Sequence, residues 1–361
     1  MKFLMMIATM FSLCGFLSAG DVVPEYPCYQ LAKPPAMNGK ADDTGWQTLP
    51  ESSAFFILGG KDYATEKRTF FRAGWTDDSL YLQVKCFEPL TGMMKISNTD
   101  GDALWSDDAM EMFFQPADTS YFQLIANSAG ARWNAIGPDN KTAKPWNWEV
   151  KSGKWEKGWL LEIRIPFAVL GKTPKNGEKW PVNIARDTTT GPAVESATSW
   201  APVQNGFNNL ERFGRFVFST EPAVAQQVKK DETKLNEPFY QYLKDQCAAK
   251  TQAAGQAELM AALDDPALAA EAKAVKEVLA QLTALQSLAE PNPNDMAIML
   301  TTWRNLTDLF SEKAKKLDIP LVKVPLKKLA VEILARQVKD VKVWVNGKAV
   351  TTQAGQWPLV L

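Results

Sequence analysis

The sequence predicts a multidomain protein, in which an all-β sandwich of the immunoglobulin-like or jelly-roll type precedes an all-α helical region and a short C-terminal β-hairpin. Three observations predict this order. Strand-length apolar runs fill the chain up to about residue 220, residues typical of helices dominate after Pro222, and an Asn-Gly dipeptide lies between two β-rich runs near the C-terminus. The 361 residues are enough for about two domains.

The first 20 residues are typical of a secretory signal peptide. Lys2 precedes an apolar stretch from Phe3 to Leu17, and the small residues at 18–20 follow it. This stretch is shorter than the about 20 residues that a membrane-spanning helix needs, and no later segment is apolar enough to span a membrane. We therefore expect cleavage after Gly20 and a secreted or periplasmic protein.

Composition excludes several classes of function. The net charge of −1 gives no basic field for nucleic acid. The chain has no histidine, which removes Ser-His and Cys-His catalysis and also histidine-ligated zinc or haem. Carboxylates, lysines, tyrosines and hydroxyls remain for any chemistry.

Residues 24–221 are predicted to form the sandwich, because their apolar residues alternate or run over strand lengths. Turn-forming residues separate these runs, as expected for many short strands. The runs are TFFRAGW (69–75), LYLQVKCF (80–87), DAMEMFF (108–114), YFQLIAN (121–127) and WLLEIRIPF (159–167).

Ten of the thirteen tryptophans lie between Trp46 and Trp200. Large aromatics on alternating strands usually fill a core. Trp146 and Trp148 either extend a ligand platform or pack at the core or rim, and the second interpretation is favoured. The tryptophans expected in the core are Trp75, Trp133, Trp159, Trp180 and Trp200.

Two arginines have two possible roles. Arg72 and Arg186 either pair with buried acids or donate to a ligand.

Residues 223–337 are predicted to form three to five helices packed as a small bundle. Pro238, Pro266 and the stretch EPNPND (290–295) are expected to break the helical pattern, and Asn294 or Asp295 to cap the helix that follows. Residues 340–361 are predicted to be a β-hairpin around Asn346-Gly347, or the start of a truncated β-domain.

Three cysteines remain after the expected cleavage: Cys28, Cys86 and Cys247. In an oxidising compartment Cys28 and Cys86 are the expected disulfide pair, because both fall in the predicted sandwich. The alternative is that both are buried thiols.

Residues 29–220 resemble the family 9 carbohydrate-binding modules and related sugar-binding sandwiches. Eight segments match in order, which makes the resemblance fairly specific. They are KPPAMNGKADDTGWQ, TFFRAGWTDDSLYLQVKCFEP, LWSDDAMEMFFQP, YFQLIANSAGA, GWLLEIRIPFAVLG, WPVNIARD, SWAPVQNGFNN and ERFGRFVF.

The resemblance implies a non-catalytic module that holds a sugar between two aromatic rings. It assigns these rings to Trp105 and Phe207, and the polar contacts to Glu111 and Asn127. A pyranose ring packs its C–H face on an aromatic plane, and its hydroxyls then need charged or amide partners. Two contacts of the family are missing, because this chain has Ile125 in place of an Arg and Ala185 in place of a Gln.

Strand geometry limits what Glu111 can do. In a strand over residues 108–115, Asp108 and Glu111 point to opposite faces, so they cannot flank one glycosidic bond about 5 to 9 Å apart. Glu111 is then a binding partner or a plain exposed residue. Asp107 and Asp108 either cap the start of the strand or bind a structural calcium, which the resemblance also implies.

Three functions remain as hypotheses. The first is a secreted, non-catalytic carbohydrate-binding protein, accessory to glycoside hydrolases and polysaccharide catabolism, whose helical region is a spacer or docks a partner. The second is a hydrolase of glycosidic bonds with its active site outside the sandwich. The third is a haem-binding sandwich of the same superfamily, for which Met110 and Met112 are available although their strand face is predicted to be core.

Overall fold

The structure, a computed structural model, describes residues 23–41, 44–117, 120–139, 146–254, 266–288, 292–316, 343–345 and 348–350. The predicted signal peptide lies outside these residues. The chain divides into two compact units, Met1–Asn236 and Glu237–Leu361.

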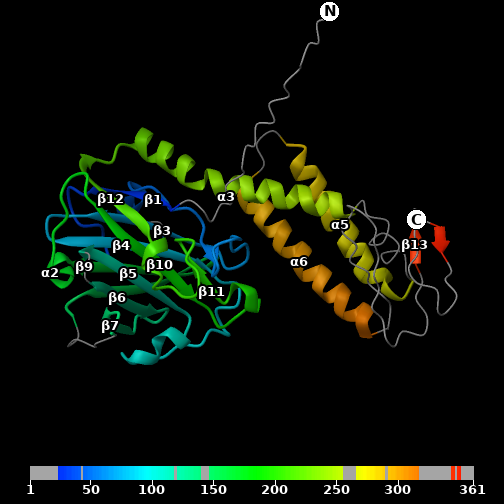
Figure 1. Ribbon diagram of the computed structural model, residues 1–361, viewed down its shortest axis with the longest axis horizontal. Coiled ribbons are helices and arrows are strands. Elements are labelled where there is room, and N and C mark those ends of the chain that lie inside the picture. The colour runs from blue at the N-terminus through cyan, green and yellow to red at the C-terminus, as the bar shows by residue number, and fades with distance from the viewer. Residues whose placement is uncertain are drawn as a thin grey trace, which may run out of the picture. The chain divides into compact units, whose positions relative to one another are not determined.

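The first unit is a β-sandwich whose strands form one hydrogen-bonded path, in the order β7-β6-β5-β10-β12-β1-β3-β4-β9-β8 (Figure 1). The short strands β11 and β2 branch from β10. The strands are β1 (Glu25–Gln30), β2 (Phe56–Ile57), β3 (Thr69–Trp75), β4 (Ser79–Phe87), β5 (Ala109–Ala117), β6 (Ser120–Asn127), β7 (Arg132–Gly137), β8 (Glu149–Trp155), β9 (Gly158–Pro166), β10 (Lys179–Asp187), β11 (Ala197–Ser199) and β12 (Gly214–Pro222).

The path folds over so that its two halves enclose one apolar core. Alternate side chains of β5, β6 and β10 pack in the same cluster as those of β3, β4 and β9. Cys86 of β4 and Met110 of β5 meet across the core, with 3.6 Å between their sulfur atoms. The predicted sandwich is therefore confirmed, and it is followed by the predicted helices.

The tryptophans follow the prediction with one exception. Those of strands β3, β9 and β10, together with Trp200, are buried in the main core. Trp148 is buried there as well, and Trp146 packs against its edge. The prediction for Trp133 is wrong, because it lies half-buried in a separate cluster on the outer face of β6 and β7. Its register explains this, since it pairs with Ile125, which also faces outward.

Cys28 and Cys86 form no disulfide in the structure. Each is a free thiol with no exposed surface in the main core. Burial raises the pKa of Cys28 and raises that of Cys86 to about 12, which keeps both groups as neutral thiols. The alternative of buried thiols therefore holds in place of the expected pair.

Helix α3 (Ala225–Ala254) begins in the first unit. Its first turns carry Asp231, which accepts a 2.6 Å hydrogen bond from Tyr29 Oη. They also carry Glu232, whose Oε1 lies 2.8 Å from Arg72 Nη1. Arg72 also pairs with Glu51. Arg72 thus forms ion pairs with acidic side chains of the protein, which was one of its two predicted roles.

Two predictions for the helices are wrong. Pro238 does not break α3, because it is exposed and the carbonyl that it leaves without a partner can reach solvent. The next helical segments are the 3-10 turn η5 (Pro266–Leu268), α5 (Ala269–Gln286) and α6 (Pro293–Lys316). The cap of α6 is Asn292, whose Oδ1 accepts from the backbone N–H of Asn294 at 2.8 Å. The proline at the first helical position explains this shift of the cap.

Helices α5 and α6 pack through one apolar stripe each. In α5 the buried residues Val275, Val278 and Leu282 recur at helical spacing. Trp303 of α6 is also buried. Farther along the chain, β13 (Val343–Val345) and β14 (Lys348–Val350) pair antiparallel, whereas the expected Asn-Gly turn lies outside the described residues.

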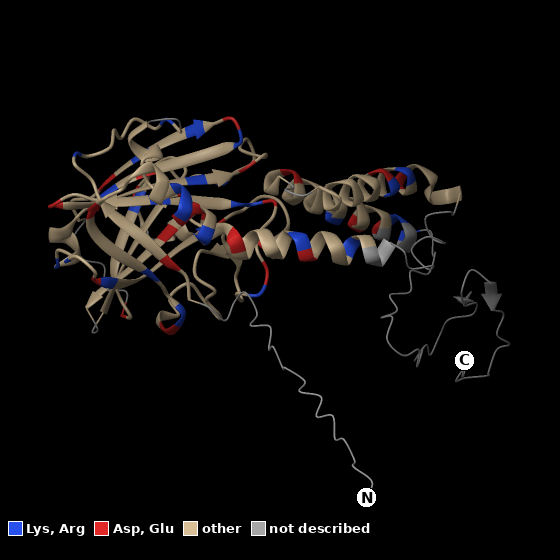
Figure 2. Cartoon of the chain, turned by 90° about the horizontal axis from the view of Figure 1, so that it is seen from above, with Lys and Arg blue, Asp and Glu red and all other residues tan. Residues whose placement is uncertain are grey.

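Charged residues of both signs are scattered over the strands and helices in the view of Figure 2. This agrees with the net charge of −1. In the part of the chain that is described, no helix has the length and apolar character to cross a membrane.

Candidate functional site

Strand β5 has two different faces. Met110, Met112 and Phe114 have no exposed surface and pack in the main core. Glu111 and Phe113 point to the opposite, outer face. The predicted alternation is confirmed, and the two methionines are core residues. Glu111 is only 7% exposed, so it is not a plain surface carboxylate.

The outer face around Glu111 is apolar on both neighbouring strands. In the antiparallel ladders, Ile125 of β6 and Ala185 of β10 stand directly opposite Glu111. Opposed residues share a face, so an apolar side chain flanks the carboxyl group on each side. Ile125 and Ala185 are the positions where the resemblance predicted an Arg and a Gln.

Two polar side chains lie diagonally from Glu111 on this face. Gln123 is two residues before Ile125 and donates a 2.7 Å hydrogen bond from Nε2 to Glu111 Oε2. Asp187 is two residues after Ala185, and its carboxyl group contacts that of Glu111. The three groups form a polar row across β6, β5 and β10.

Trp105 lies at one end of this face. It belongs to the 3-10 helix η2 (Asp102–Ser106). The preceding Leu104 is buried against Ala109 of β5 and Ile125 of β6, which fixes the helix over the outer face. Trp105 itself is 60% exposed. Its ring is therefore carried on a turn that is fixed by a buried neighbour, and most of its surface is open to solvent.

Phe207 lies at the other end of the same face. Its ring is half-buried against a cluster that includes Phe113 of β5 and Tyr121 of β6. Two hydrogen bonds hold its loop, because Asn183 Nδ2 donates to the Phe207 carbonyl at 2.8 Å and Asn208 Nδ2 donates to Tyr121 Oη at 3.2 Å.

The register of β5 brings the two aromatic residues to one face. Ala109 and Phe113 lie two residues on either side of Glu111 and point the same way. The helical turn of Trp105 packs at Ala109, and the loop of Phe207 packs at Phe113. Glu111 therefore lies between the attachment points of the two rings.

Asn127 holds the loop before β5 and has no group left for a ligand. Its Nδ2 donates to the Ser97 carbonyl at 2.7 Å and to Asp107 Oδ2 at 2.9 Å. Its Oδ1 accepts from the backbone N–H groups of Ala129 and Ala131. The side chain is fully buried, so its geometry fits a positioning role instead of the ligand contact that the resemblance implies.

Asp107 and Asp108 are also fully buried, and protein donors satisfy all four of their carboxylate oxygens. This arrangement fits the capping role better than the calcium role. Within the described residues, no group of three or more Cys, Asp or Glu side chains is arranged to hold a metal ion. The donors are the backbone N–H and Oγ of Ser97 and the Asn127 amide for Asp107, and the backbone N–H of Lys95, both Thr188 and Thr189 hydroxyls and the Thr189 N–H for Asp108.

The Glu111–Asp187 pair is the main electrostatic feature of the face. Burial raises the pKa of Glu111, although hydrogen bonds from Asp187 and Gln123 offset part of this effect. Burial and the nearby Glu111 charge together raise the pKa of Asp187 to about 9. Two carboxylates in contact cannot both be ionised cheaply, so the pair retains one proton at neutral pH.

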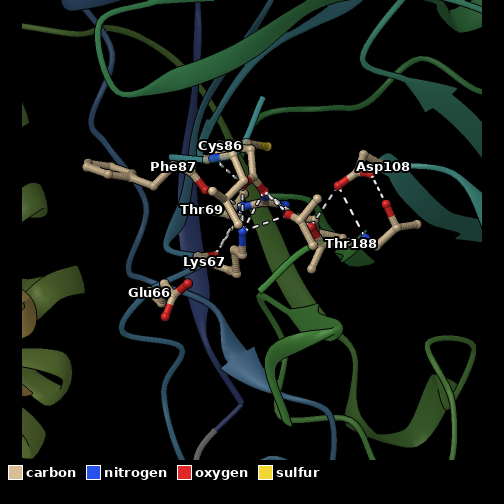
Figure 3. A network of polar contacts seen from close by, with 12 residues as sticks. Glu66, Lys67, Thr69, Cys86, Phe87, Asp108 and Thr188 are labelled. Carbon is tan, nitrogen blue, oxygen red and sulfur yellow. Dashed lines mark hydrogen bonds and ion pairs between the residues drawn. The ribbon is translucent and has the colours of Figure 1, made fainter. Parts of the chain in front are cut away.

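A buried ionic network supports β10 from the other face (Figure 3). Lys67 Nζ contacts both oxygens of Glu88, at 2.6 and 2.7 Å, and Arg186 Nη2 lies 3.0 Å from Glu88 Oε2. None of these three side chains is exposed. The Thr188 hydroxyl lies 2.8 Å from Asp108 Oδ1, which links the network to the start of β5. Arg186 therefore has the predicted structural role.

Sequence reasoning missed Asp187 as a partner of Glu111. The two residues lie 76 positions apart in the sequence, and only the pairing of β5 with β10 brings them together. The available signal was the alternation of β10, which places Asp187 on the opposite face from the buried Arg186.

These observations define a class of protein: a β-sandwich with a buried carboxyl group on one sheet face and an exposed tryptophan on a helical turn that packs over this face. The family model described as "Carbohydrate family 9 binding domain-like" matches residues 37–220. The chain therefore belongs to this carbohydrate-binding family, and the predicted resemblance is confirmed. A comparison with curated proteins gives no match.

The solved structures that the chain matches include the following three. Two are family 9 carbohydrate-binding modules from Caldicellulosiruptor kristjanssonii. The one in complex with cellotriose has 15% identity and a TM-score of 0.42, covering 55% of this chain and 94% of that chain. The one in complex with glucose has 15% identity and a TM-score of 0.40, covering 54% and 96%. The third, from Bacteroides uniformis ATCC 8492 and assigned to carbohydrate binding, has 17% identity and a TM-score of 0.45, covering 55% and 100%.

Proposed function

We propose that the sandwich binds a carbohydrate on the outer face of β5, β6 and β10, with a sugar ring against Trp105 and its hydroxyls on Glu111. The observation that carries this proposal is the 60% exposure of Trp105, on a helical turn that packs over the face where Glu111 is buried. Membership of a carbohydrate-binding family supports it independently.

The chemistry of the face suits a sugar. An indole offers a flat apolar surface for the C–H face of a pyranose ring, and packing there removes water from both. The carboxyl pair and Gln123 then accept or donate hydrogen bonds to hydroxyls in a partly dry environment, where such bonds are strong. Phe207 would close the other side of the ring, and Asn127 would position the loop that carries Trp105.

The flanking side chains predict modest affinity. Ile125 and Ala185 give no polar contact beside Glu111. One aromatic platform and one charge-assisted contact correspond to a binding free energy of about −4 to −5.5 kcal/mol, which is a Kd of roughly 0.1 to 1 mM.

We further infer that the protein is exported and non-catalytic, as an accessory to polysaccharide degradation. The leader pattern of residues 1–20 supports export. The contact between the Glu111 and Asp187 carboxyl groups supports binding over hydrolysis, because glycosidase carboxyl groups stand at least about 5 Å apart.

Isothermal titration against a panel of neutral mono- and oligosaccharides, glucose and cellotriose included, tests the proposal. We expect the unsubstituted protein to bind at least one sugar and Trp105→Ala to bind it at least tenfold more weakly. The matched control is Tyr240→Ala, which removes a 38% exposed aromatic ring from α3. Equal binding by all three proteins would reject the platform.

A further inference from the structure

We propose that Asp187 is a second ligand-contacting carboxyl group, and that it and Glu111 act together as one acceptor for two adjacent hydroxyls of a neutral sugar. This inference rests on the proposed function and adds the group that replaces the two missing polar contacts.

The positions of the side chains carry the first step. Gln123, Glu111 and Asp187 lie on successive strands and on the same face, and each contacts the next. Glu111 and Asp187 lie diagonally across the β5–β10 ladder, and the two directly opposed partners, Ala185 and Ala109, carry only methyl groups, which leaves room for the carboxyl groups to meet. The Gln that the resembling family has in place of Ala185 would fill that space.

The second argument concerns the burial and the hydrogen bonds of the Asp187 and Glu111 carboxyl groups. Asp187 is partly exposed as a residue, but its Oδ2 atom is buried without a hydrogen-bond partner in the protein. Glu111 has Gln123 as a donor on Oε2. The neighbouring Glu111 carboxyl group shares a proton with the buried side of Asp187, and a sugar hydroxyl would approach the part of Asp187 that remains exposed.

The third argument concerns the charges that surround the two carboxyl groups. No described cation forms an ion pair with Glu111 or Asp187. Arg186 points to the opposite face and pairs with Glu88. Lys95 lies beside η2, where its Nζ donates to Ser106 Oγ and stands 3.9 Å from Asp107. Asp108 adds a further negative charge near Asp187.

The pair therefore carries a single negative charge with one proton held between two carboxyl groups. Its outward oxygens can accept from two neighbouring hydroxyls, and its charge disfavours an acidic sugar. This defines the ligand class as a neutral sugar unit with a vicinal diol.

A cycle of protein and ligand changes tests this inference. The affinities of the unsubstituted protein, Asp187→Ala and Asp187→Asn are measured by NMR titration with the best sugar of the panel and with its monodeoxy analogues. We expect Asp187→Ala to bind about tenfold more weakly, because a hydrogen bond to a charged group is lost. Asp187→Asn keeps an acceptor and should restore most of the affinity.

The decisive measurement is the loss of affinity when one hydroxyl of the sugar is removed. For one hydroxyl, the loss on removal should be about tenfold in the unsubstituted protein and absent in Asp187→Ala. Equal penalties in both proteins for every hydroxyl would show that Asp187 does not touch the ligand and would overturn the inference while sugar binding stands. If the unsubstituted protein binds no sugar, the proposed function and the inference both fail. Melting of each variant checks that it is folded.

Discussion

Asp187 is the residue whose chemistry departs most from its ordinary behaviour. An unfolded Asp has a pKa of about 3.9, whereas in the folded protein burial and the Glu111 charge raise it to about 9. Between these values the folded chain holds a proton that the unfolded chain has lost. Stability should therefore be highest near pH 4 and fall as the pH rises toward 9.

Asp187→Asn should remove this dependence. At pH 8 the variant is expected to be more stable than the unsubstituted protein, by about 1 to 3 kcal/mol, because no buried acid has to retain a proton. Near pH 4 the two should melt together. Melting curves from pH 4 to 9 measure this, with the exposed Asp77→Asn as the control. Parallel pH profiles for all three proteins would contradict the shared proton.

Lys67 is expected to be the most costly charged residue to remove. Lys67→Met deletes a fully buried ammonium group that contacts both oxygens of Glu88, leaving that buried carboxylate with less compensation. We expect a loss of about 3 kcal/mol in the free energy of unfolding, measured by chemical denaturation. Lys179→Met breaks the half-exposed pair with Glu25 and should change stability by less than about 1 kcal/mol. Similar losses for both variants would contradict the importance of the network.

At the scale of secondary structure, helix α3 gives the clearest test. It runs through Pro238 without a break, although proline in a helix interior costs about 3 kcal/mol relative to alanine. Pro238→Ala should therefore stabilise the helix by about 1 to 3 kcal/mol. Pro266→Ala, at the first position of η5, is the control and should have little effect. Denaturation followed by circular dichroism measures both, and an unchanged midpoint for Pro238→Ala would indicate that the helix ends there.

The same elements indicate which features the sequence could predict. Alternation placed Met110 and Glu111 on opposite faces of β5, because side-chain direction in a strand depends only on local geometry. The cap of α6 and the continuity of α3 were mispredicted, because solvent access and one neighbouring proline decide them. The Glu111–Asp187 contact depends on which strands pair, and local periodicity does not carry that information. Trp133 was misassigned for the same reason, since its face is set by its pairing with Ile125.

At the scale of the whole molecule, the free thiols bear on the compartment. Cys28, Cys86 and Cys247 are buried without a disulfide. A chain that begins after Gly20, as proposed, should therefore release three reactive thiols per molecule on unfolding, without a reductant, and few before it. Ellman titration in the absence and presence of denaturant measures this. One thiol per unfolded chain would instead indicate the Cys28–Cys86 disulfide.

The proposed binding face is a preformed recognition surface on a sandwich that has a large apolar core. The two proposed aromatic contacts come from the segments that pack at the two ends of β5, which are far apart in the sequence and held by partly buried hydrogen bonds. Such a surface needs little rearrangement to bind, so affinity depends on the few groups that face the sugar.

The most direct test of this account is a crystal structure of the protein with an oligosaccharide from the panel. We expect one sugar ring stacked on the Trp105 indole, with adjacent hydroxyls within hydrogen-bonding distance of Glu111 and Asp187. A sugar seated on another surface, with the outer face of β5 empty, would contradict it.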